Sequence, residues 1–193
     1  MAATPATLPT RLEADASGDA RRLVALAKCG DHDAWDQLYR RIYSRLRAYA
    51  TRRVSPDAVD DVVNETMTRA VAGIERFSWE PSGFDAWLFG IARRVAADHH
   101  RGSARVRRTN HRADLIDVVS NPGEALEIAE DHARVRAGFE LLGPADRELL
   151  ELRVIAGLTV EQAATVLGKR AGAVRTAQSR ALARLRAIVE REP

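Results

Sequence analysis

The chain has 193 residues, 46% hydrophobic and 30% charged, a balance typical of folded globular proteins and not of disordered chains. It carries 30 Lys and Arg against 27 Asp and Glu, so the formal net charge is only +3. The single cysteine, Cys29, excludes an internal disulfide and a zinc site built from several cysteines. No apolar run is long enough for a transmembrane helix and the N-terminus lacks a secretory-signal pattern, so we expect a helical, cytoplasmic protein.

Apolar residues at helical spacing predict helices through the first half of the chain, after a flexible tail over residues 1–19. A short helix is expected over residues 21–30. The next helices are expected to begin at Asp31, a plausible N-cap, at Ser55-Pro56, where a cap precedes a first-turn proline, and after a loop at residues 77–83. Four such helices can close one core, which predicts a first domain over residues 20–101.

The second half predicts a separate helical domain. Periodicity lapses over residues 102–122, which indicates a basic linker, and helical spacing resumes over residues 123–193. There, Thr159 and Gln162 have the spacing of a capping box, and Gly168 is placed to end the short helix that follows. A longer helix is expected from Ala171. Two helices joined by a tight glycine turn make a helix-turn-helix motif.

Charged residues are segregated along the chain. Residues 169–186 and 101–112 contain basic residues without any acid, whereas residues 56–67 contain acids without any base. Blocks of opposite sign indicate one surface for a polyanion and another for a basic protein partner. For any single block, a solvated helix face is an equally good interpretation.

The second helix of the motif suits DNA, because a helix fits the major groove and residues near its N-terminus can reach base edges. Its expected inward residues are Val174, Ala177, Leu182, Leu185 and Ile188. The candidates for DNA contact on its outer face and flanks are Arg170, Arg175, Thr176, Gln178, Ser179 and Arg180. A helix pair of an ordinary bundle is the alternative for this segment, and the acid-free stretch favours DNA.

The helix after Pro56 predicts a different kind of surface. Its apolar residues, at helical spacing, are Val59, Val62, Val63 and Met67. The polar residues that then project from the other side are Asp60, Asp61, Asn64 and Glu65, with no basic residue expected within the same two turns. DNA phosphates repel carboxylates, so the expected complement is a basic or amide-rich protein surface.

Three segments resemble the extracytoplasmic-function (group IV) sigma factors of bacterial RNA polymerase, of the sigma-70 family. DDVVNETM at 60–67 is similar to a family helix with the pattern acid-acid-apolar-apolar-amide-acid-Thr-apolar. FDAWLFGIAR at 84–93, followed by Asp98 and Arg101, is similar to the helix that meets the −10 promoter element. Several short motifs between residues 142 and 174, among them LGPADR and QAA, resemble the domain that reads the −35 element.

The resemblance implies an all-α protein of two small helical domains joined by a flexible linker, sigma region 2 and sigma region 4, with no cofactor, metal or catalytic residue. It implies a factor that binds the β′ and β subunits of core polymerase and directs transcription initiation at promoter DNA, for a regulated stress or developmental regulon. Core polymerase would bind the acidic helix. The implied −10 residues are Trp79, Ser82, Arg94, Asp98 and Arg101. An anti-sigma factor is a further partner that family membership allows.

The chain departs from the family pattern at Arg170, where Ser or Thr is usual, at Ala173, where Thr is common, at Arg94, often Asn in the family, and over residues 176–178, where the family is more basic. These departures concern the promoter sequence and not the fold. Trp79 has a second interpretation, because the ring could simply pack against Phe77.

Two other functions fit parts of the sequence. A stand-alone helix-turn-helix regulator would need a first domain that senses a ligand or dimerises, which fits poorly with opposed acidic and basic faces. A metal hydrolase would have to draw on Asp98, His99, His100, His32 and Cys29, although a lone cysteine is more often a small buried residue than a nucleophile. Adjacent histidines on a helix point about 100° apart, so they do not easily share one metal ion.

Overall fold

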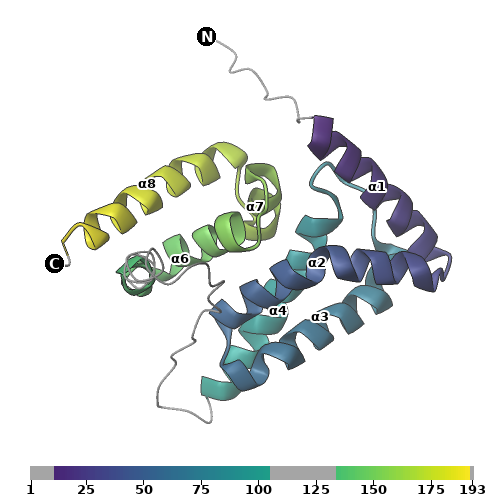
Figure 1. Ribbon diagram of the computed structural model, residues 1–193, viewed down its shortest axis with the longest axis horizontal. Coiled ribbons are helices and arrows are strands. Elements are labelled where there is room, and N and C mark those ends of the chain that lie inside the picture. The colour runs from purple at the N-terminus through teal and green to yellow at the C-terminus, as the bar shows by residue number, and fades with distance from the viewer. Residues whose placement is uncertain (1–10, 105–133, 192–193) are drawn as a thin grey trace, which may run out of the picture.

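The computed structural model describes residues 11–104 and 134–191, and every regular element in these two ranges is helical (Figure 1). The N-terminal domain comprises α1 (Arg11–Lys28), α2 (His32–Arg53), α3 (Val59–Gly73) and α4 (Gly83–Ala104), with 3-10 turns at Pro56–Ala58 and Ile74–Arg76. The C-terminal domain comprises helical residues 134–140, α6 (Pro144–Leu150), a π-helical turn (Glu151–Ile155), α7 (Val160–Leu167) and α8 (Ala171–Val189). The predicted all-α class is confirmed.

Local sequence signals start and stop several helices as predicted. Asp31 caps α2, its Oδ1 accepting a 2.9 Å hydrogen bond from the amide of Ala34. At α7 the capping box is complete: the Gln162 amide donates to Thr159 Oγ1 at 3.2 Å, and the Thr159 amide donates to Gln162 Oε1 at 2.8 Å. Gly168 ends α7 in the left-handed region, at φ +63°, where a side chain would be strained. The predicted helix-turn-helix is therefore present.

Two predicted boundaries are wrong. Helix α1 begins at Arg11, so the second half of the expected 1–19 tail is helical. The last proline there is Pro9, and the RLEADA segment that follows is rich in good helix formers. Helix α4 runs to Ala104, past the expected start of the linker at 102. Most of that linker, and the start of the predicted second domain up to residue 133, lie outside the described residues.

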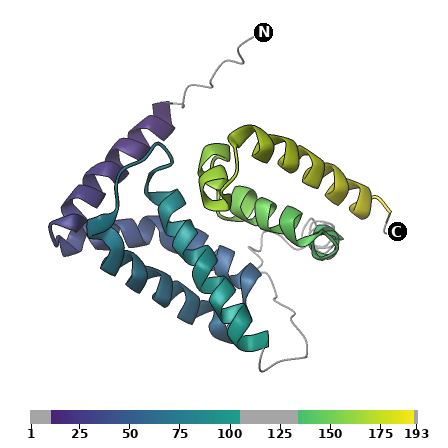
Figure 2. The ribbon, with the colours of Figure 1, turned by 180° about the vertical axis from the view of Figure 1, so that it is seen from behind.

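The main hydrophobic core extends across both domains, which corrects the prediction that the first four helices close a core of their own. It joins Leu46 of α2, Val62 of α3 and Phe89 of α4 to Leu158 and Ala163 of the C-terminal domain. The N-terminal part of α4 lies next to α7 (Figure 2). Consecutive residues of α4, such as Leu88 and Phe89, are both buried, so this helix is apolar on more than one face and has surface left for α7.

Candidate nucleic-acid and protein interfaces

Helix α3 has the two faces that its sequence predicts. Val59, Val62 and Val63 are buried in the core, together with Thr66, while Met67 is only partly buried. On the opposite side are the polar candidates: Asp60, Asp61 and Asn64 are exposed, and Glu65 is half-exposed. We call these four residues the acidic face. A broad open groove between α3 and α4 runs along it, lined by Asp61, Asn64, Glu65, Thr68, Arg69, Val95, Asp98 and His99.

The expectation that no base pairs with the acidic face is wrong. Arg69 lies one turn after Glu65 and donates to its Oε1 at 2.7 Å, and Arg47 of α2 approaches Asp60 to 3.7 Å. Arg69 lies two residues past the 60–67 segment, and the contact of Arg47 with Asp60 joins two different helices. Both pairs are largely exposed, where ion pairs contribute little to stability and exchange readily for other partners. The acidic face therefore stays available to a charged surface.

Three of the −10 candidates share one face of α4, because Arg94, Asp98 and Arg101 are spaced by four and three residues. Asp98 accepts hydrogen bonds from Arg101 and, at 3.4 Å, from Arg69 of α3. These hydrogen bonds, that of Arg101 foremost, hold the pKa of the Asp98 carboxyl below its usual range. Asp98 is thus a charged link between α3 and α4. It lies about 22 Å along α4 from the loop that holds Trp79 and Ser82.

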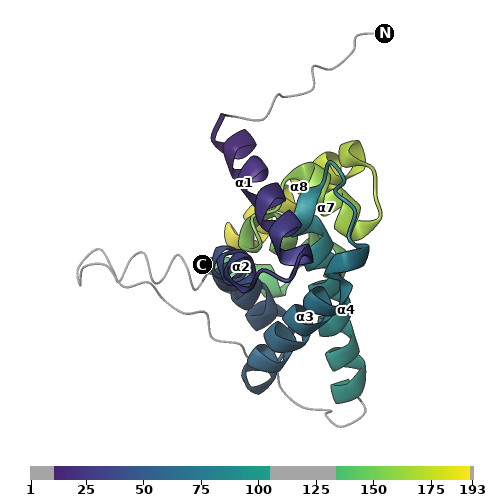
Figure 3. The ribbon, with the colours of Figure 1, turned by 90° about the vertical axis from the view of Figure 1, so that its right-hand side faces the viewer.

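The other two −10 candidates lie in the loop between Phe77 and Gly83. Trp79 is half-buried and stands edge-on to Phe77, with ring centroids 5.9 Å apart, so the packing interpretation of Trp79 is seen directly. Ser82 is buried, with 8% of the residue exposed. A small cleft beside it is lined by Arg76, Phe77, Ser78, Glu80, Ser82, Gly83, Trp87 and Thr165. Because Thr165 belongs to α7, this side of the loop faces the helix-turn-helix (Figure 3).

Helix α8 presents most of its DNA candidates to solvent. Arg170, Arg175, Thr176, Ser179 and Arg180 are exposed, whereas Gln178 is half-buried and accepts a 2.8 Å hydrogen bond from Arg153. Val174 is buried as predicted, but Leu182 is 43% exposed and its predicted inward place is wrong. The buried position belongs to Ala181, because seven residues after Val174 complete about two turns and return to the same face.

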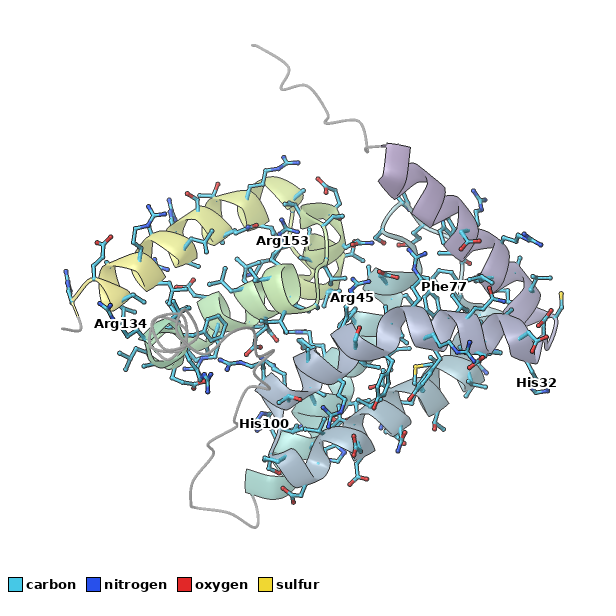
Figure 4. All side chains as sticks on the ribbon, viewed as in Figure 1. His32, Arg45, Phe77, His100, Arg134 and Arg153 are labelled. Carbon is cyan, nitrogen blue, oxygen red and sulfur yellow. The ribbon has the colours of Figure 1, made fainter. Side chains whose placement is uncertain are left out.

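Residues 169–186 contain no acid, but in the structure two of their arginines pair with acidic residues of other helices. Arg175 donates to Glu161 of α7 at 2.9 Å, and Arg184 pairs with Asp146 of α6. Arg153, which sequence reasoning missed, donates to the carbonyl of Leu158 as well as to Gln178, and so holds the π-helical turn against α8 (Figure 4). No sequence pattern singles it out, because its partners are set by the turn.

A second group that sequence reasoning missed lies where the domains meet. Glu151 is 0% exposed, and its Oε2 accepts a 2.9 Å hydrogen bond from Arg53 of α2. Glu148 accepts hydrogen bonds from Arg53 at 3.1 Å and from Arg93 of α4 at 2.9 Å. Burial raises the pKa of Glu151. For Glu148 burial acts the same way, but the two arginines outweigh it and the pKa is lowered.

Arg45 adds a second bridge between the domains. From α2 it donates to Asp85 of α4 at 2.7 Å and to the carbonyl of Ala156, also at 2.7 Å, and it lies on the side of α2 that faces the C-terminal helices (Figure 4).

Within the described ranges, no three His, Cys, Asp or Glu side chains are grouped closely enough to hold a metal ion. None of the helices described is both long and apolar enough to cross a membrane.

Comparison with known proteins agrees with this arrangement. Sigma-70 region 2 matches residues 38–106, which include α3, the loop and α4, and Sigma-70 region 4 matches residues 139–187, which include the helix-turn-helix. The chain is 33% identical over 174 residues to the ECF RNA polymerase sigma factor BldN of Streptomyces coelicolor, covering 86% of this chain and 66% of that protein.

Two further similarities extend over most of this chain and most of the compared protein. The ECF RNA polymerase sigma factor SigD of Mycobacterium tuberculosis is 32% identical over 173 residues, which cover 85% of this chain and 81% of that protein. A solved structure of CnrH in complex with the cytosolic domain of CnrY superposes with a TM-score of 0.67 at 29% identity, covering 91% of this chain and 99% of that one. With both sigma regions present in order on one helical fold, the chain belongs to the extracytoplasmic-function sigma factors of the sigma-70 family.

Proposed function

We propose a division of labour among three surfaces of this sigma factor. The acidic face of α3 binds the β′ subunit of core RNA polymerase. The loop between Phe77 and Gly83, which carries Trp79, opens and holds the −10 element together with the face of α4 that carries Arg94, Asp98 and Arg101. Helix α8 binds the −35 element. The observation that carries the proposal is the separation of charge in space. Carboxylates gather on α3, whereas the exposed outer surface of α8 around Arg170 and Arg180 has no acid of its own.

Electrostatics supports this assignment. A polyanion attracts basic surfaces and repels acidic ones, so a helix with Asp60, Asp61 and Glu65 on one face is suited to a basic protein and not to phosphates. The reverse holds for α8, whose exposed arginines can neutralise phosphates while polar side chains near its N-terminus approach base edges. The ion pair between Arg175 and Glu161 joins two exposed side chains, so it can open at little cost when DNA approaches.

An anti-sigma factor is the proposed regulatory partner. Its support is the family resemblance, together with the fact that CnrH, which is similar in sequence and fold over nearly its whole chain, was solved bound to another protein, the cytosolic domain of CnrY. We propose that the genes controlled form a regulated stress or developmental set, as the family resemblance implies.

The direct test is transcription from genomic DNA by core polymerase with and without this protein. We expect new transcript starts that share two upstream elements near −10 and −35 and that require the protein. Sequencing the 5′ ends maps these promoters and supplies the DNA for the experiments below. If the protein binds DNA by itself and adds no starts to core polymerase, the proposed division of labour is wrong.

Arg175→Ala should relax promoter choice at one base pair of the −35 element, at a cost of about 1–3 kcal/mol on the preferred sequence. The matched variant is Arg180→Ala, which we expect to weaken all sequences alike, because a phosphate contact carries no sequence information. Expression from a library of −35 variants measures both. An equal loss by Arg175→Ala on every variant would assign Arg175 to phosphate instead.

Trp79→Ala should impair opening of the −10 element. An unpaired base held against an aromatic ring is stabilised by about 1–3 kcal/mol, which the variant loses. Permanganate footprinting of unpaired thymines in the −10 region, with holoenzyme at a mapped promoter, measures the opening. Core affinity serves as the control and should not change. Normal opening by a folded Trp79→Ala protein removes Trp79 from the site and leaves only its packing on Phe77.

A further inference from the structure

We infer that Lys28, at the C-terminal end of α1, is a positioning residue for promoter opening: it fixes the loop that carries Trp79. The inference rests on the proposed function of that loop. Lys28 lies outside every motif that carries the family resemblance. Its ammonium group donates to the backbone carbonyl of Phe77, the first residue of the loop, and makes a longer 3.5 Å contact with the carbonyl of Glu75.

The two carbonyls that Lys28 contacts belong to the end of a helical turn. The 3-10 turn Ile74–Arg76 ends at Phe77, so these oxygens lie where a helix carries partial negative charge and lacks intrahelical donors. A cation placed there satisfies oxygens that the backbone cannot satisfy, and it sets the direction in which the chain leaves the turn. Lys28 also lies 5.9 Å from the centre of the Phe77 ring.

Phe77 transmits this constraint to the rest of the loop. It is 6% exposed and lies among three other aromatic rings, with centroid distances of 5.9 Å to Trp79, 6.1 Å to Phe84 and 5.0 Å to Trp87. Trp79 therefore takes its orientation from a ring whose own backbone Lys28 holds. At the far end the loop closes in a turn, where the Gly83 amide donates to the Glu80 carbonyl at 2.9 Å.

Helix α1, which supplies these contacts, is held in place by its packing in the core. Leu23, Val24 and Ala27 are buried in the core, so the helix cannot shift without losing apolar packing. A second cation of α1, Arg21, lies seven residues before Lys28 and hence on nearly the same face. Its guanidinium is 5.9 Å from the centre of the Trp79 ring. Two cations two turns apart on α1 thus contact the loop at Phe77 and at Trp79.

A loop held in this way is ordered before DNA arrives. Holding an unpaired base requires fixed side chains, and ordering them during binding would cost conformational entropy that a preformed loop avoids. Lys28 needs no contact with DNA to act in this way. Removing its ammonium group should weaken promoter opening while leaving the attachment to core polymerase and the reading of the −35 element intact.

The test compares Lys28→Met, which keeps most of the aliphatic stem, with Lys28→Arg, which keeps a cation, in full-length protein assembled with core polymerase. Arg22→Met is the matched control, because Arg22 is an exposed cation of the same helix and the charge change is the same. Opening is measured by permanganate footprinting on a mapped promoter. For Lys28→Met we expect the opening equilibrium to fall about tenfold, which corresponds to 1.4 kcal/mol at 25 °C. Lys28→Arg and Arg22→Met should open the promoter nearly as the unmodified protein does.

Combination with Trp79→Ala separates positioning from direct contact. If Lys28 acts through Trp79, the double variant opens no worse than Trp79→Ala alone, because the effects of coupled residues do not add. A full further loss in the double variant would mean that Lys28 contacts DNA phosphate itself, and the inference would be wrong. Equal defects in Lys28→Met and Lys28→Arg would overturn it as well, since a cation at this position would then not matter.

The same set of variants distinguishes failure of this inference from failure of the proposed function. A defective Trp79→Ala protein beside a normal Lys28→Met protein overturns the role of Lys28 alone. Normal opening by Trp79→Ala overturns base capture by the loop, and the positioning role falls with it. Binding of each variant to core polymerase, measured by competition, shows that any defect belongs to opening and not to assembly.

Discussion

Asp61→Lys combined with Glu65→Lys should abolish competition for core RNA polymerase while leaving the sigma factor folded. Both residues lie on the acidic face of α3, away from the buried valines, so two lysines there disturb no packing. If the face meets a basic surface, the change turns attraction into repulsion. Loss of one partner of a buried charge pair commonly costs about 2–5 kcal/mol, or about thirtyfold to several thousandfold in affinity.

The measurement is displacement of a labelled reference sigma factor from core polymerase. A matched control is Asp33→Lys with Asp36→Lys, which makes the same change of charge on two exposed acids of α2. The control should compete nearly as the unmodified protein does, apart from small effects of long-range charge. Unchanged core affinity of the folded Asp61 and Glu65 variant would show that the acidic face is only a solvated surface.

Arg53→Met should destabilise the protein by about 3–5 kcal/mol, because it leaves the fully buried carboxylate of Glu151 without its cation. Urea unfolding of the whole chain measures the loss. The double variant Arg53→Met with Glu151→Leu should recover most of it, since an apolar pair of similar volume needs no charge compensation. A loss below about 0.5 kcal/mol in the single variant would show that the pair contributes nothing to holding the domains together.

The penalty in Arg53→Met should shrink as the pH falls from neutral into the range where Glu151 takes up its proton, which urea unfolding at a series of pH values measures. Burial already raises the pKa of Glu151 with Arg53 present, and removal of the cation raises it further. A carboxyl whose pKa is higher in the folded state binds its proton more tightly there, so folding is favoured as the pH falls through that pKa. Glu148, whose pKa is lowered in the unmodified protein, keeps Arg93 as a partner in the variant.

Features that depend on neighbouring residues were predictable from the sequence. The cap at Asp31, the capping box of Thr159 and Gln162, and the stop at Gly168 all use atoms within four residues of one another. The same holds for the direction in which α3 faces, because a helical period and a run of valines are enough to define it. Such signals are complete within one or two turns, so no tertiary information is needed to interpret them.

Helical periodicity alone did not determine which of two adjacent residues, Ala181 or Leu182, is buried in the core. Leu182 is the larger and more hydrophobic residue, and hydrophobicity favours it for the core, yet Ala181 is buried and Leu182 is 43% exposed. Ala181 packs in one buried cluster with Leu142 and Leu150, where α8 lies against α6. Which residue of such a pair faces inward depends on the distance between two helices, and this distance is a tertiary quantity.

By itself, the sequence determined the helical class, the helix-turn-helix, the acidic face of α3 and the family to which the chain belongs. Only the tertiary structure decided which charges meet. The partners Arg53 and Glu151, Arg45 and Ala156, and Lys28 and Phe77 are separated by 98, 111 and 49 residues. No local period links positions so far apart. The first two contacts exist because α4 is apolar on more than one face and α7 packs against it, which brings α2 beside the C-terminal domain. The contact of Lys28 follows from the packing of α1 beside the Ile74–Arg76 turn.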